Sequence, residues 1–115
     1  MKQWQVLITI FPDVISENFE FVNYQESTDR LDYWLDERGY MSREDYKIGT
    51  VREYGFTDER LIQDFPIRGK AVYLHVRRRK WRDTEDGSIF TYDYDLTEEG
   101  SRLTPEFVAF LKEEN

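Results

Sequence analysis

The sequence predicts an α+β fold, in which a small sheet of antiparallel β-hairpins carries a C-terminal helix and a short N-terminal helix. Two observations predict it. Runs of β-branched and aromatic residues recur between turn signals along most of the chain. An amphipathic run with helix-start residues follows near the C-terminus. With 115 residues the chain has the size of one modest core, so we expect residues 1–115 to form a single domain.

The N-terminal residues favour one strand and one short helix. Residues 4–10 are rich in apolar and β-branched side chains, so propensity alone predicts a strand there. Residues 11–18 predict a short helix, because Pro12 lies near the first turn, where a helix tolerates proline.

A hairpin is predicted over residues 19–37. The run 19–26 alternates loosely, and the Ser-Thr-Asp sequence at 27–29 is a turn signal. The next run places three apolar residues on one face at period two, namely Leu31, Tyr33 and Leu35.

Residues 39–59 are rich in charge and interrupted by Gly49 and Gly55. We interpret this segment as a long connection that contains a short helical turn around residues 42–45.

Two turns divide residues 61–95 into three strands. The first turn is Arg68-Gly69, and the second is Asp86-Gly87, an Asp-Gly pair of the kind that favours a hairpin. The predicted strands are residues 61–67, 70–82 and 88–95.

The C-terminal helix is predicted over residues 104–113. Thr104 is a suitable N-cap, and Pro105 fits the first helical position. Phe107, Phe110 and Leu111 follow at helical spacing, so their apolar stripe is expected to pack on the sheet.

Composition narrows the function classes. The net charge is −8, which argues against nonspecific nucleic-acid binding by the whole surface. The chain has no cysteine, so a disulfide framework and a cysteine-ligated metal site are excluded. No apolar run reaches the ~20 residues of a membrane helix, and no signal peptide is recognisable. We therefore expect a cytoplasmic protein without a membrane partner, metal or other cofactor.

One basic cluster stands out in this acidic chain. Residues 68–82 hold seven of the sixteen basic residues and no acid. The candidate DNA-binding residues are these seven and the tryptophan among them: Arg68, Lys70, Arg77, Arg78, Arg79, Lys80, Trp81 and Arg82.

Alternation predicts how this cluster is presented. Val72, Leu74 and Val76 should share one face, and His75, Arg77, Arg79 and Trp81 the other, unless a bulge intervenes. A two-residue loop at Asp86-Gly87 would set Trp81 opposite Tyr92. The same register would pair Lys80 with Asp93 and Arg78 with Asp95.

Three interpretations of the cluster remain open. Cross-strand ion pairs and arginine stacking on aromatic rings occur in monomers without any ligand. A basic two-stranded ribbon can instead contact phosphates in a DNA groove. Arginine, tryptophan and tyrosine are also the usual anchors of protein–protein interfaces.

No enzyme active site is predicted. His75 is the single histidine, and a packed or hydrogen-bonded role suits it better than catalysis, since no serine or cysteine nucleophile pattern accompanies it. Asp64 is interpreted as a turn cap. The sequence contains neither a glycine-rich phosphate loop nor a paired-histidine metal motif.

The sequence resembles the N-terminal region of bacterial insertion-sequence transposases in which this region is a small separate reading frame. The resemblance rests on Ile62-Gln-Asp-Phe-Pro-Ile-Arg-Gly-Lys70 and Leu74-His-Val-Arg-Arg-Arg-Lys-Trp81. It continues through Asp93-Tyr-Asp-Leu96, Glu99-Gly-Ser-Arg-Leu-Thr104 and Glu106-Phe-Val-Ala-Phe-Leu-Lys112. Phe11-Pro12 and Asn18-Phe-Glu20 resemble the start of such regions.

The resemblance implies non-catalytic DNA binding at transposon ends, with catalysis carried by a separate transposase chain. Related transposases have a zinc ribbon with a Cys-x-x-Cys turn after the basic strand. This chain has Asp83-Thr84-Glu85-Asp86 there, so metal binding is not carried over. The resemblance also favours a helix over a strand for residues 4–10. The alternative function is a protein-interaction module that docks the catalytic chain or self-associates, without DNA binding.

Overall fold

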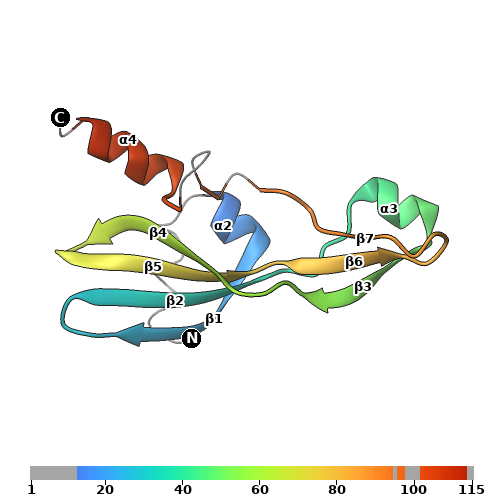
Figure 1. The fold of residues 1–115 in the computed structure, drawn as a ribbon, viewed down its shortest axis with the longest axis horizontal. Helices are drawn as coiled ribbons and strands as arrows, with labels where there is room; N and C mark the ends of the chain where they lie inside the picture. The colour runs from blue at the N-terminus through green and yellow to red at the C-terminus, as the bar shows by residue number, and fades with distance from the viewer. Residues whose placement is uncertain (1–12, 95, 98–101, 114–115) are drawn as a thin grey trace.

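The computed structural model describes residues 13–94, 96–97 and 102–113, and Figure 1 shows their arrangement. The predicted α+β class is confirmed. The elements are α2 (Asp13–Asn18), β1 (Phe19–Glu26), β2 (Arg30–Glu37), α3 (Arg43–Ile48), β3 (Val51–Phe56), β4 (Arg60–Ile67), β5 (Lys70–Arg77), β6 (Arg79–Asp83), β7 (Ile89–Phe90) and α4 (Pro105–Glu113). Residues 4–10, predicted first as a strand and then as a helix, lie outside the described part.

The strands form two sheets placed one after the other along the molecule (Figure 1). The larger sheet has the order β1-β2-β5-β4, and the smaller has the order β3-β6-β7. The predicted hairpin over 19–37 is confirmed, since β1 and β2 pair antiparallel. β2 and β5 pair parallel, which the expectation of antiparallel hairpins did not include.

The core lies on one face of the larger sheet. Val72, Leu74 and Val76 of β5 are at most 3% exposed, as the alternation predicted. They join a cluster of buried residues from α2, β1, β2, β4 and the segment after β7: Ile15, Phe19, Phe21, Leu31, Tyr33, Leu35, Ile62 and Leu96. Burial of this apolar face is the main source of stability for the larger sheet.

Helix α4 begins as the sequence predicted, with Pro105 as its first residue. The hydroxyl of Thr104 donates to the buried carboxylate of Asp64 on β4 at 2.7 Å and accepts the N–H of Phe107 at 3.3 Å. Asp64 therefore anchors the helix to the sheet through Thr104. The ring of Phe65 packs against that of Phe110, with centroids 4.4 Å apart.

The segment predicted as a long connection contains two elements. Helix α3 occupies Arg43–Ile48, capped by Ser42 at its start, and strand β3 occupies Val51–Phe56. A bulge between Glu53 and Gly55 interrupts the alternation of β3, and Gly55 takes a positive φ of 105° there. The bulge hides the period-two pattern that identifies a strand in sequence.

The single strand predicted over residues 70–82 is divided at Arg78. Its first part, β5, is central in the larger sheet, and its second part, β6, is central in the smaller one. The predicted strand 88–95 is reduced to β7, and Trp81 pairs with Phe90 instead of Tyr92. The reason is that Asp83 N–H donates to the carbonyl of Ser88 at 2.9 Å, so the turn holds four residues and not two.

Candidate nucleic-acid interface

The fold separates the basic cluster that the sequence placed together. Arg68 and Lys70 lie at the β4–β5 turn, while Lys80 and Arg82 lie on β6. A strand rises ~3.3 Å per residue, so the stretch of chain from Lys70 to Lys80 spans roughly 30 Å. Lys70 also forms an ion pair with Glu26 at 2.6 Å. Arg68 and Lys70 therefore do not extend the surface formed by β6.

Arg77 is engaged by the protein itself. Its Nε and Nη2 donate to the two carboxylate oxygens of Asp36 at 2.8 and 2.6 Å. Its guanidinium also lies over the ring of Phe56, 4.4 Å from the centroid. Such bidentate pairs hold an arginine in one orientation.

Arg78 and Arg79 have internal partners as well. Arg79 donates from Nε to the carbonyl of Glu37 at 2.9 Å and from Nη1 to Glu53 at 3.0 Å. Arg78 lies 3.5 Å from the exposed carboxylate of Asp93. The predicted partner of Arg78, Asp95, lies outside the described residues. The interpretation of the cluster as internal ion pairs thus applies to these arginines.

Trp81 is not a surface residue, which corrects its assignment as a DNA contact. It is 1% exposed, and its ring packs at 5.5 Å on the ring of Tyr92. Trp81 shares one face of the smaller sheet with Val51, which is also 1% exposed. The smaller sheet needs its own buried residues, and the largest side chain of β6 fills that role.

The opposite face of the smaller sheet carries cations that the protein does not neutralise. Arg52 of β3 lies directly across from Arg82 of β6, and Lys80 follows on the same side of β6. The ring of Tyr54 lies near the two cations of β6, with its centroid 5.5 Å from Lys80 Nζ and 5.8 Å from Arg82 Cζ. We call these four residues (Arg52, Tyr54, Lys80 and Arg82) the outer basic face.

The cations of the outer basic face repel one another when no anion is bound. Within the described residues, no carboxylate lies within ion-pair distance of Arg52, Lys80 or Arg82. Like charges placed directly across two strands are destabilising, and the cation–π contacts to Tyr54 offset only part of this repulsion. An anion bound over this face, next to Arg52 and Arg82, would relieve the repulsion.

Sequence reasoning missed two of the four residues, Arg52 and Tyr54, because their strand was assigned to a connection. The signal for a strand was present in Val51, Tyr54 and Phe56, which are β-favouring residues within six positions. The bulge at Gly55 breaks their alternation.

A polar cluster occupies the outer face of the larger sheet. His75 Nε2 lies 2.7 Å from Asp32 and Nδ1 lies 2.9 Å from Glu59. The imidazole also stacks on Trp34, with centroids 4.2 Å apart. His75 is therefore hydrogen-bonded, as its sequence context indicated. Arg30 completes the cluster through a bidentate pair with Asp32 at 2.8 and 2.7 Å.

This cluster predicts a pH dependence. The hydrogen bonds from Arg30 lower the pKa of Asp32 below 3.8, with a further contribution from His75. A carboxyl whose pKa is depressed by folding stabilises the native state above its unfolded pKa and loses that contribution as the pH falls through the folded pKa. We expect Arg30→Gln to raise the pKa of Asp32, as measured by a carboxyl ¹³C NMR titration. An unchanged midpoint would show that Arg30 is not the main cause.

The described part of the chain holds no group of three or more His, Cys, Asp or Glu residues suited to a metal ion. Among the same residues, no helix has the length and apolar character to cross a membrane. Comparisons of the chain with protein-family models, with curated proteins and with solved structures find no match.

Proposed function

We propose that this chain is a non-catalytic DNA-binding region of an insertion-sequence transposase, and that it binds the phosphate backbone through the outer basic face. The observation that carries the binding proposal is the set of three cations without carboxylate partners, two of which lie over the ring of Tyr54. Phosphates are the natural ligands of such cations, and Tyr54 adds a hydrogen-bonding hydroxyl. A separate catalytic chain as partner and a cytoplasmic location belong to the same proposal, which takes the partner from the sequence resemblance and the location from the composition.

The proposal changes the residues that were first expected to contact DNA. Arg77 and Arg79 are held by Asp36, Glu37 and Glu53, so they shape the protein and are not the primary phosphate ligands. Arg52, from a different strand, takes their place beside Lys80 and Arg82. Its Nη1 donates to the carbonyls of Gly49 and Val51 at 2.9 Å, but these acceptors are neutral and leave its charge without a carboxylate partner.

Removing the three cations tests the proposal. We expect Arg52/Lys80/Arg82→Ala to weaken binding to duplex DNA and to reduce the slope of log affinity against log salt concentration by ~3. The measurement is fluorescence anisotropy with a labelled duplex over a series of salt concentrations. Because the substitution removes a like-charge pair, the free energy of unfolding should not fall substantially.

The matched control removes the same charge elsewhere. Arg68/Lys70/Arg102→Ala deletes three cations outside the smaller sheet and should leave the salt slope close to the wild-type value. Equal losses in both variants would show that only net charge matters. A wild-type chain that binds no DNA but whose mass rises with concentration would favour the protein-interaction alternative.

A further inference from the structure

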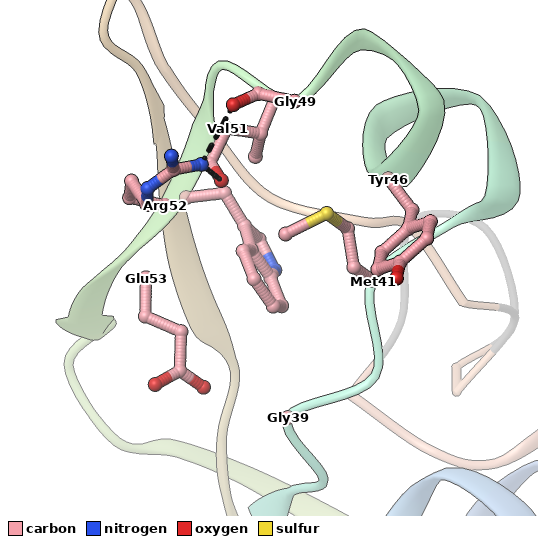
Figure 2. Close-up of a pocket in the computed structure, with 8 residues that line it drawn as sticks. Gly39, Met41, Tyr46, Gly49, Val51, Arg52 and Glu53 are labelled. Carbon is pink, nitrogen blue, oxygen red and sulfur yellow. Dashed lines mark hydrogen bonds between the residues drawn. The ribbon is translucent and has the colours of Figure 1, made fainter.

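Two adjoining cavities lie beside α3 in the smaller-sheet half of the molecule. The first, of about 640 Å³, is lined by residues from α3, β3, β6 and the segment before α3 (Figure 2). The second, of about 440 Å³, lies against the same helix. Gly39, Met41 and Tyr46 line both, so the two cavities form one groove, which we call the α3 groove.

Two tyrosines line the α3 groove with their rings largely in solvent. Tyr46 is 78% exposed and Tyr40 is 68% exposed. Neither has a ring-stacking partner among the described residues. An exposed aromatic residue is ordinary on its own, but two beside one cavity provide a stacking surface.

Two cations complete this lining. Arg43 and Lys47 lie four residues apart on α3, which places them on one side of the helix, and both line the second cavity. Within the described residues neither is close enough to a carboxylate to form an ion pair. The nearby Asp45 accepts a hydrogen bond from the hydroxyl of Tyr92 at 2.6 Å.

The first cavity also holds an unused hydrogen-bond donor. Trp81 lines it, and the indole N–H is buried without an acceptor in the described structure. Buried polar groups are nearly always hydrogen-bonded, so an orphaned donor beside a cavity suggests a ligand acceptor. Met41, which lines the cavity beside it, has a flexible side chain that can turn aside for a ligand.

We propose that the α3 groove binds one unpaired nucleotide, with its base stacked on Tyr46 and its phosphate between Arg43 and Lys47. The occupant follows from the lining, because stacking rings interleaved with unpaired cations match single-stranded nucleic acid. Arg52 lies on the edge strand β3, belongs to the outer basic face and also lines the first cavity, where its Nη1 donates to the carbonyl of Gly49 at 2.9 Å (Figure 2). It therefore links the groove to the proposed DNA surface around the edge of the smaller sheet. This inference rests on the proposed function. It specifies which DNA the protein should favour, namely a duplex whose end carries unpaired bases.

The test compares a blunt duplex with the same duplex carrying a four-nucleotide overhang. Fluorescence anisotropy at low salt measures both affinities for the wild type and for Tyr46→Ala, Arg43/Lys47→Ala and Lys80/Arg82→Ala. We expect the wild type to prefer the overhang by about fivefold or more, and Tyr46→Ala and Arg43/Lys47→Ala to lose most of that preference. Because Tyr46 is exposed, its removal should leave the circular-dichroism melting curve unchanged. Ile48→Ala is the matched control, since Ile48 is an exposed residue of the same helix that lines neither cavity.

The outcomes separate the two proposals. No preference for the overhang in the wild type, or a preference that survives in Tyr46→Ala, overturns the nucleotide site. The outer basic face is tested by the blunt duplex alone, which Lys80/Arg82→Ala should bind more weakly while the overhang preference persists. Blunt-duplex binding that Lys80/Arg82→Ala leaves intact overturns the proposed function and not the groove. Binding of neither oligonucleotide by the wild type overturns both.

Discussion

Replacing Glu37 with alanine is expected to lower the free energy of unfolding by about 3 kcal/mol. Glu37 is 0% exposed and lies at the end of β2, beside the point where β5 passes into β6. Its Oε1 accepts the backbone N–H of Arg79 and its Oε2 accepts the hydroxyl of Tyr94, both at 2.9 Å. Alanine would leave both donors without an acceptor and open a cavity between the sheets.

The hydroxyl of Tyr94 remains a hydrogen-bond donor over the ordinary pH range. Burial raises the pKa of Tyr94, and the hydrogen bond to Glu37 raises this pKa further. The phenol therefore stays protonated and continues to donate. Since Tyr94 also packs edge-on against Phe19, with centroids 5.4 Å apart, its position links the junction to the core of the larger sheet.

Glu37→Gln is the matched control for this substitution. Its amide oxygen can accept the N–H of Arg79, and its amide nitrogen can donate to the oxygen of Tyr94, so we expect it to lose less than half as much stability as Glu37→Ala. Urea unfolding followed by circular dichroism measures both variants. A Glu37→Ala variant as stable as the wild type would contradict the role of Glu37 in coupling the two sheets.

The second large effect is expected at Trp81. Trp81→Ala should lower the free energy of unfolding by about 4 kcal/mol, because it removes the largest buried side chain of the smaller sheet. Trp81→Phe should cost roughly half of that or less. Phenylalanine keeps an aromatic ring that can contact Tyr92. It removes the rest of the indole, including an N–H that has no acceptor among the described residues, and so leaves a smaller cavity than alanine does.

Hydrogen exchange distinguishes this role from a surface role. In Trp81→Ala the amides of β3 and β6 should lose protection before those of β2 and β5, because Trp81 belongs to the smaller sheet. If Trp81→Ala kept wild-type stability and lost only DNA binding, the original assignment of Trp81 to the DNA surface would be correct.

Local signals were sufficient for part of the fold. Thr104-Pro105 marked the start of α4, because a hydroxyl N-cap and a proline at the first position satisfy helix geometry within a few residues. The alternation of Val72, Leu74 and Val76 identified the buried face of β5, because side chains of a strand point to opposite sides in turn.

Fewer residues of the candidate site could be predicted from the sequence. The basic run at 77–82 identified the relevant strand, and Lys80 and Arg82 remain on the proposed surface. Nothing in the run distinguished those two from Arg77 and Arg79, because the carboxylates that neutralise the latter come from β2 and β3. Arg52 reaches the same surface only through the pairing of β3 with β6.

Local sequence patterns were enough to predict the α+β class, the first hairpin, the buried face of β5 and the start of α4, since each depends on spacing and on residues close in the chain. Only the three-dimensional fold shows that β5 pairs in parallel with β2, that the strand divides at Arg78, and that Trp81 is buried while Lys80 is half-buried and Arg82 exposed. These outcomes depend on which distant strands meet. Strand pairing is selected by the packing of the whole core, because backbone hydrogen bonds are nearly equivalent in competing registers.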